Sequence, residues 1–392
     1  MRKLLWIGDA AVSTGFARAT HHTLEVLRRT WEVHVLGINY QGDPHKWPYP
    51  IYPCWPGGDM FGLERTAPLV NQIQPDLVII QNDPWNVGEY VKRIDKKAPV
   101  VASMPVDGKN CRGNSLNDLA LAIFWTKFGL DEARKGGFHG LAEVIPLGVN
   151  TELYQPMDRL EARKTVGLPG LEDAFIVGNV NRNQPRKRLD LSVEYFAEWV
   201  KRNNLTNAYL FLLVAPTGEM GYNVRQLMSY YGFNDKNKRL ILGEPPVGRG
   251  LDEELMPSVY SSFDVQISTT QGEGWGLTTM EGMACGIPQI VPDWSALGEW
   301  CEDAVLKVNC STHSVTPNYI NVVGGLPDKE EFMRALDLMY LTRQWSDNQS
   351  GWAQFRKKGL ELVNRPEYRW EAIGQRFAEA LEEPYAQSKK VA

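Results

Sequence analysis

The chain has 392 residues, 43% of them hydrophobic and 23% charged, which is enough for two domains with sizeable cores. Its formal net charge of −5 argues against bulk attraction to nucleic acid or to an anionic membrane. No stretch approaches the ~20 apolar residues of a membrane span, and the five scattered cysteines lack metal-ligand spacing, so we expect a cytoplasmic protein with reduced thiols.

Short apolar runs alternate with helical patterns up to residue 145. Strands are predicted at residues 3–8, 32–38, 76–81, 99–104, 119–125 and 142–145. Helices are predicted at residues 16–29, 63–74, 86–97 and 128–137. This alternation predicts a parallel sheet with helices on both faces. The connection over residues 39–62, rich in glycine, proline and aromatic residues, is predicted to be a loop.

A looser stretch at residues 146–173 is predicted to link two domains, and the alternation then restarts. Strands are predicted at residues 174–180, 208–215, 239–243, 263–268, 287–291 and 305–308. Helices are predicted at residues 189–202, 223–231, 252–261, 277–285, 296–301, 329–343 and 350–363. A last helix, over residues 370–382, follows a break at Pro366. We therefore expect a second α/β sheet of similar design.

The loop after the first strand contains Gly15 at the start of a helical pattern. Open α/β sheets bind ligands at the carboxyl ends of their strands, and a glycine lets the backbone approach a ligand closely. The competing interpretation is simple helix capping by Ser13, Thr14 and Gly15. Both interpretations stay open from the sequence.

A basic loop follows the first strand of the second domain. It places four cations within seven residues, with Arg182 first and Arg188 last. A charge run of this kind usually belongs to a solvated loop. Here the run lies at the carboxyl end of a strand. We therefore interpret it as a phosphate clamp in which Arg182 binds bidentately and Lys187 acts as a point charge.

A glycine loop at residues 272–276 follows the strand at 263–268 and leads into a short helical pattern. The N–H groups of Gly276, Leu277 and Thr278 would point outward at the positive end of the helix dipole, which favours an anion. Gly286 is predicted to end the helix in a left-handed conformation. An ordinary glycine loop before a surface helix is the competing interpretation.

Two carboxylates flank this loop, Glu273 within it and Glu281 about one turn into the helix. A carboxylate is an awkward neighbour for a phosphate but a natural acceptor of hydrogen bonds from hydroxyl groups. Glu281 therefore suits a ribose, and Glu273 suits a sugar.

In combination these motifs resemble retaining glycosyltransferase family 4. Residues 272–288 resemble the paired-glutamate motif of that family, residues 184–191 its phosphate-binding lysine motif, and residues 145–156 its interdomain signature. The resemblance implies the GT-B fold, α/β in class, with two facing Rossmann-like domains and a cleft between them. It implies an acceptor-side domain at residues 1–157 and a nucleotide-sugar-binding domain at 158–368. A C-terminal helix at 369–392 is expected to pack back on the N-terminal domain.

The resemblance also implies an activity, a hexosyl- or pentosyltransferase that uses a nucleotide-diphospho-sugar in the cleft. Arg182 and Lys187 would neutralise the diphosphate, Glu281 would hold the ribose, and Glu273 would hold the sugar hydroxyls. The full implied binding set is Gly15, Arg182, Lys187, Val247, Gly274, Trp275, Gly276, Leu277, Thr278 and Glu281. No metal ion, no separate cofactor and no enzyme nucleophile are expected. A nucleotide-sugar epimerase and a non-catalytic nucleotide-sugar binder of the same fold are the alternatives.

The acceptor side departs from the family pattern. Family members often carry a histidine after the fourth strand of the first domain, where this chain has Asp107. Asp107 is a candidate catalytic residue that would contact the sugar or orient the acceptor, and a structural role in a turn is equally consistent. The acceptor stays open among a glycan, a lipid carrier, a small molecule and a hydroxylated DNA base. Lys92, Arg93 and their basic neighbours leave peripheral membrane contact open, with a solvated helix face as the competing interpretation.

Overall fold

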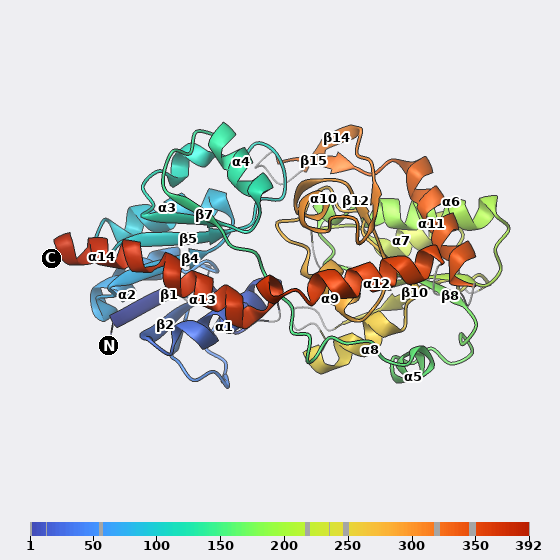
Figure 1. The fold of residues 1–392 in the computed structure, drawn as a ribbon, viewed down its shortest axis with the longest axis horizontal. Coiled ribbons are helices and arrows are strands. Elements are labelled where there is room, and N and C mark those ends of the chain that lie inside the picture. Colours follow the sequence, from blue (N-terminus) through green and yellow to red (C-terminus); the bar gives the residue numbers. More distant parts are fainter. Residues whose placement is uncertain are drawn as a thin grey trace. The chain divides into compact units, whose positions relative to one another are not determined.

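A computed structural model describes residues 2–12, 14–54, 58–215, 220–234, 236–245, 251–316, 322–344 and 350–391 (Figure 1). The chain divides into two compact units. The first unit contains residues 1–148 and 366–392, and the second contains residues 149–365. Each unit is built on its own parallel sheet, with helices packed against it.

The first unit has a sheet of seven strands in the order β3-β2-β1-β4-β5-β6-β7, and every neighbouring pair is parallel. Its strands are β1 (Arg2–Asp9), β2 (Trp31–Ile38), β3 (Ile51–Pro53), β4 (Leu77–Gln81), β5 (Val100–Met104), β6 (Leu121–Phe124) and β7 (Ala142–Val144). Six of them are predicted from the sequence. The prediction of an uninterrupted loop over residues 39–62 is wrong at β3, which lies at the edge of the sheet, where the missing donor of Pro53 is tolerated.

The helices of the first unit come from both ends of the chain. They are α1 (Gly15–Leu27), α2 (Leu63–Ile73), α3 (Pro84–Ile94), η1 (Gly113–Leu116), α4 (Lys127–Lys135), η4 (Pro366–Tyr368), α13 (Trp370–Ala380) and α14 (Glu382–Val391). The strand order reverses direction at β1, which lies between β2 and β4. Ligands of open α/β sheets bind at such switch points, and the loop leading to Gly15 follows β1.

Helix α13 lies beside α1 within the first unit (Figure 1). A Cβ atom on Gly374 would lie 2.4 Å from a methyl carbon of Val26, so glycine is what allows this close approach. The ring of Trp370 stacks on His22 with 4.8 Å between centroids. The segment after Pro366 therefore contributes to the core of the first unit, although the rest of that unit comes from residues 1–148.

The basic residues of α3 are paired with carboxylates. Lys92 lies 2.7 Å from Glu89, and Arg93 lies 3.0 Å from Glu89 and 3.5 Å from Glu64. These exposed pairs support the solvated-face interpretation of this helix. Within the described ranges, no helix combines the length and the apolar character needed to cross a bilayer.

The second unit has a parallel sheet of six strands in the order β10-β9-β8-β11-β12-β13. Its strands are β8 (Phe175–Val180), β9 (Ala208–Leu213), β10 (Leu240–Gly243), β11 (Val265–Ile267), β12 (Gln289–Pro292) and β13 (Leu306–Val308). An antiparallel pair, β14 (Thr312–Val315) with β15 (Val323–Leu326), separates β13 from the next helix and is absent from the prediction.

The helices of the second unit agree with the predicted set to within a few residues at each end. They are α5 (Arg159–Thr165), η2 (Pro185–Lys187), α6 (Leu189–Arg202), α7 (Val224–Tyr230), η3 (Glu253–Leu255), α8 (Met256–Ser261), α9 (Leu277–Ala284), α10 (Ser295–Trp300), α11 (Lys329–Arg343) and α12 (Gly351–Val363). The apolar faces of α6, α7 and α11 form one buried core with the sheet.

A buried carboxylate aligns the two strands that carry the candidate site. Asp264, 1% exposed, accepts from the backbone N–H of Ile176 at 2.7 Å and forms ion pairs with Arg163 at 2.7 Å and Arg343 at 2.9 Å. The N–H of Asp264 donates in turn to the carbonyl of Ile176 at 2.8 Å. Because these bonds hold β8 beside β11, the loops at the carboxyl ends of the two strands emerge side by side.

Candidate functional site

The basic loop after β8 is fixed by a side chain in its middle. Asn183 is fully buried and donates to the carbonyl groups of Ala215 at 3.0 Å and Tyr222 at 2.7 Å. Its Oδ1 accepts from the N–H of Tyr222 at 2.8 Å. The loop is thereby tied to the segment after β9, which limits where its cations can point.

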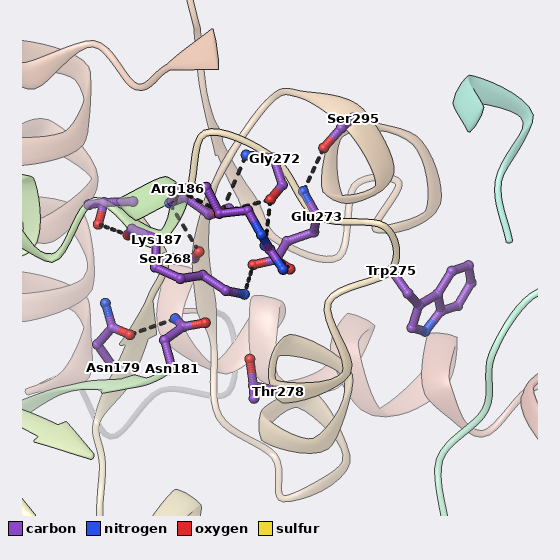
Figure 2. A network of polar contacts seen from close by, with 12 residues as sticks. Asn179, Asn181, Arg186, Lys187, Ser268, Gly272, Glu273, Trp275, Thr278 and Ser295 are labelled. Atoms are coloured by element: carbon purple, nitrogen blue, oxygen red, sulfur yellow. Dashed lines mark hydrogen bonds and ion pairs between the residues drawn. The ribbon is translucent and has the colours of Figure 1, made fainter. Parts of the chain in front are cut away.

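A chain of buried hydrogen bonds joins the basic loop to the end of β11. Asn181 donates to Asn179 at 2.7 Å, and Asn179 donates to Ser192 on α6 at 2.9 Å (Figure 2). The Ser192 hydroxyl lies 2.6 Å from that of Thr269, which donates to the carbonyl of Arg188 at 2.8 Å. A satisfied buried network of this kind rigidifies the groups it connects. The two loops therefore form one rigid edge of the sheet.

The glycine loop turns into α9 at Gly276. Its φ of +92° is a left-handed conformation, and a Cβ atom there would lie 2.6 Å from Cδ2 of Leu297. Gly276, Leu277 and Thr278 are partly exposed, whereas residues 268–275 before them are buried. The start of α9 is thus the point where the loop meets solvent, as an anion cradle requires.

The other end of α9 confirms the predicted role of Gly286. Its φ is +75°, and its N–H donates to the carbonyl of Met283 at 2.9 Å. The N–H of Ile287 donates to the carbonyl of Gly282 at 2.9 Å, which completes a Schellman motif.

Glu273 and two cations from the basic loop form the centre of the site (Figure 2). The Lys187 ammonium forms an ion pair with Oε1 of Glu273, and Arg186 Nη1 lies 3.2 Å from Oε2. The backbone N–H of Glu273 donates to the Ser295 hydroxyl at 3.0 Å. Glu273 is predicted to bind sugar hydroxyl groups and Lys187 to bind phosphate. In the structure the two side chains contact each other.

The electrostatics of this cluster favour an ionised Glu273. Only 7% of the residue is exposed, and burial raises the pKa of its carboxyl group. The charges of Lys187 and Arg186 and their hydrogen bonds outweigh burial and hold that pKa below its usual value. The result is a buried carboxylate that keeps its charge at neutral pH.

The second carboxylate, Glu281, is 3% exposed and lies on α9. The hydroxyl of Tyr260, a fully buried residue of α8, donates to Glu281 Oε2 at 2.6 Å. This bond orients the carboxylate, because an oxygen that accepts from a buried phenol cannot rotate freely.

The side chain of Trp275 points away from the charged cluster (Figure 2). It is buried and stacks on Trp300, with 4.9 Å between ring centroids and 11° between planes. Trp300 Nε1 donates to the Trp275 carbonyl at 2.6 Å. Trp275 thus anchors the glycine loop by packing, and its buried side chain does not point toward the charged cluster.

The other predicted site residues are distributed over both units, and one of them lies outside the described residues. Arg182 follows β8 and is exposed, whereas Gly274 is buried in the glycine loop. Gly15 and Asp107 belong to the first unit, Gly15 at the first position of α1 and Asp107 half-buried after β5. Val247 lies outside the described residues.

Capping explains part of the loop before α1. Thr14 accepts from the N–H of Ala17 at 3.1 Å and donates to the Asp9 carboxylate at 2.7 Å. Capping by Thr14 is therefore confirmed, whereas Ser13 lies outside the described residues.

Residues 172–316, which include both loops and both glutamates, match the family model described as Glycosyl transferases group 1. This match lies within the second unit, residues 149–365. The group 1 glycosyl transferase match thus spans β8 to β14, and with them the Lys187–Glu273 pair and Glu281.

Curated relatives match part of the chain. The D-inositol 3-phosphate glycosyltransferase of Geodermatophilus obscurus is 31% identical over 188 residues, which cover 45% of this chain and 40% of the relative. The enzyme of the same description from Stackebrandtia nassauensis is 33% identical over 152 residues, or 38% of this chain and 32% of the relative. The matches span less than half of the length of these relatives.

Solved structures match nearly the whole chain at low identity. Sucrose-phosphate synthase from Thermosynechococcus elongatus has a TM-score of 0.76 and 18% identity, and the match covers 99% of this chain and 100% of that one. Anabaena HepE in complex with UDP has a TM-score of 0.70 and 16% identity, with 97% and 99% covered. These matches show the fold, which is GT-B, with two Rossmann-like α/β domains.

Three residues of the candidate site are absent from the sequence-based assignment: Arg186, Tyr260 and Ser295. Arg186 lies within the basic run, but the sequence pattern does not say which of its cations reaches the glutamate. Arg188, two residues on, instead bonds Asp190 at 2.7 Å and 2.9 Å. Tyr260 meets Glu281 because α8 packs against α9, a tertiary contact that the sequence pattern does not predict.

His, Cys, Asp and Glu side chains can act as metal ligands. In the part of the chain that the structure describes, no group of three or more of them is placed to hold a metal ion.

Proposed function

We propose that the protein is a retaining glycosyltransferase that moves a sugar from a nucleotide-diphospho-sugar to an acceptor hydroxyl. The observation that carries this proposal is the cluster of Lys187, Arg186 and Glu273 beside the start of α9. It puts cations, partly exposed backbone N–H groups and a buried carboxylate at one edge of a sheet in a group 1 glycosyl transferase unit. Cations and amides suit a diphosphate, and a carboxylate suits sugar hydroxyls.

In the proposed reaction the protein stabilises the leaving group. Negative charge grows on the diphosphate as the bond from the anomeric carbon breaks. Arg182, Lys187 and the N–H groups at residues 276–278 stabilise that charge where it develops. Glu281, oriented by Tyr260, holds the ribose, and Glu273 holds hydroxyl groups of the donor sugar.

Retention is proposed to follow from attack on the face that the diphosphate leaves. The acceptor hydroxyl then passes its proton to the departing phosphate, so that no enzyme nucleophile takes part. We propose that the reaction needs neither a metal ion nor a separate cofactor, because Arg182 and Lys187 already supply positive charge. A role for Asp107 in contacting the sugar or orienting the acceptor belongs to the same proposal.

The choice of substrates to test follows from the similar proteins. HepE of Anabaena is known in complex with UDP-glucose, so UDP-glucose is the first donor to try. GDP-mannose and ADP-glucose extend the panel to other bases. D-Inositol 3-phosphate, named in the relatives, is the first acceptor, with glucose and inositol as neutral comparisons.

The test combines this panel with EDTA and follows the release of nucleoside diphosphate. We expect one donor to be consumed in the presence of an acceptor. The proton NMR spectrum of the product should show the anomeric configuration of the donor retained. Transfer that EDTA abolishes would contradict the metal-free mechanism, and an inverted product would contradict retention. Donor binding without transfer would favour a non-catalytic binder, and epimerised sugar released with no acceptor would favour an epimerase.

A further inference from the structure

Glu273 has two cationic partners that come from adjacent residues of η2. Lys187 contacts Oε1, and Arg186 lies 3.2 Å from Oε2. Arg186 Nη1 also donates to the carbonyl of Gly272 at 3.0 Å. Its guanidinium therefore holds both the side chain of Glu273 and the backbone of the residue before it.

The two cations differ in what they can do. An ammonium is a compact charge on a flexible stem, whereas a guanidinium is a planar fork that binds two acceptors in fixed directions. The Lys187 side chain is 10% exposed and that of Arg186 is 27% exposed. Lys187 can turn to another anion, but the same motion by Arg186 would break its bond to the glycine loop.

The proposed function requires Lys187 to serve the diphosphate. In the structure, however, Lys187 contacts Glu273. When it turns to the diphosphate, a carboxylate that is 7% exposed loses one of its two compensating charges. A buried carboxylate without a cation is driven toward the protonated form.

We propose that Arg186 is a positioning residue that keeps Glu273 charged and aimed at the donor sugar while Lys187 serves the diphosphate. This inference rests on the proposed function. Arg186 acts through Glu273 and need not touch the donor itself. Among the described residues, the charged groups that face the Glu273 carboxylate are Lys187 and Arg186, both from η2, while the neutral hydroxyl of Ser295 on α10 accepts from the backbone N–H of Glu273.

Arg186→Gln should change the pH dependence of the reaction, whereas loss of another positive charge from the same loop should not. With the arginine gone, the pKa of Glu273 rises once Lys187 leaves it. The acidic limb of the kcat/KM profile should therefore move to higher pH by about one unit. At neutral pH the loss should be roughly tenfold and mainly in kcat, because one charge-assisted hydrogen bond is lost from a group that holds the reacting sugar.

Arg188→Gln is the matched control. It removes the same charge from the same loop, but the Arg188 guanidinium is held by Asp190. Its pH profile should stay that of the wild type. Arg186→Lys is the conservative variant and should return the acidic limb toward its wild-type position, since it restores a cation beside Glu273.

The experiment measures steady-state kinetics of these variants and the wild type from pH 5 to 8, with the donor from the panel that the wild type uses. If Arg186→Gln keeps the wild-type acidic limb, or if Arg188→Gln moves it equally, the inference is wrong and the proposed function stands. If the wild type transfers no sugar from any donor, the proposed function fails and the inference fails with it.

Discussion

At Glu273, the residue types in the sequence predict that a site is present but not which side chains contact each other. The sequence is sufficient to mark a glutamate in a glycine loop and a lysine in a basic loop as parts of one site. It does not reveal that the two contact each other. Which cation of a run reaches inward depends on the turn at η2 and on the left-handed backbone of Arg188, with φ +48°. Neither leaves a periodic signal in the sequence.

The charge of Glu273 should contribute to folding in a way that depends on pH. Its pKa is lowered in the folded protein, so its stabilisation is present above the ordinary value of 4.5 and is lost as pH falls through the folded value. Glu273→Gln should lower the free energy of unfolding by about 3 kcal/mol at pH 7, because it leaves buried cations without their partner. The deficit should shrink as the solution is acidified below pH ~4.

Glu302→Gln provides the comparison for this prediction. Glu302 forms a bidentate pair with Arg365 at 2.7 and 2.8 Å, but both side chains are exposed. Its loss should cost less than about 1 kcal/mol at any pH. Denaturant titrations at pH 7 and pH 4 measure both variants. Equal deficits for the two variants, or a Glu273→Gln deficit that grows in acid, would contradict this account of the cluster.

At the scale of elements, the strand–loop–helix units could be predicted from apolar runs and helical periodicity. Helices α6 and α11 begin and end at the predicted residues. The elements that were missed are short or atypical. Strand β3 has three residues, one of them Pro53, and β14 and β15 form a hairpin between the predicted strand at 305–308 and the predicted helix at 329–343, where no element is predicted.

That hairpin supports the glycine loop. The N–H of Gly325 donates to the carbonyl of Gln271 at 3.0 Å, and Gln271 Nε2 donates to the carbonyl of Ser314 at 3.1 Å. The loop that carries Glu273 is therefore braced by β14 and β15, by α10 through Ser295, and by η2 through Arg186. A long-range brace of this kind is set by tertiary packing, which the local sequence does not encode.

The turn into α9 gives a prediction at this scale. Gly276→Ala adds a Cβ atom at a φ of +92° and 2.6 Å from Leu297, whereas Gly232→Ala adds one at a φ of +80° with open space around it. The left-handed conformation alone should cost about 1–2 kcal/mol at Gly232. Gly276→Ala should cost a further ~1–3 kcal/mol for overpacking, and it alone should weaken binding of nucleoside diphosphates.

Chemical denaturation and a binding titration of both variants check this prediction. The same loss of stability at both positions would mean that Leu297 yields freely to the added methyl group. Unchanged binding by Gly276→Ala would mean that the start of α9 is not part of the anion site.

At the scale of the whole molecule, length and alternation were enough to predict two α/β sheets. The two compact units meet in sequence after Gly148 and after Arg365, and residues 366–392 belong to the first unit. An exposed ion pair of Arg29 with Glu371, at 2.6 Å, and the rings of Trp6 and Phe377, 6.4 Å apart, accompany that grouping. Such contacts between opposite ends of a chain have no signature in either segment alone.

The central claim is that the edge formed by β8 and β11 binds a nucleoside diphosphate through Lys187. Calorimetric titration of the wild type and of Lys187→Gln with UDP, GDP and ADP, in EDTA, tests it most directly. The account predicts that the wild type binds at least one of the three. It also predicts that Lys187→Gln binds that ligand at least about tenfold more weakly, a difference of about 1.4 kcal/mol. Failure of the wild type to bind any of them, or equal affinity in the variant, would contradict the account.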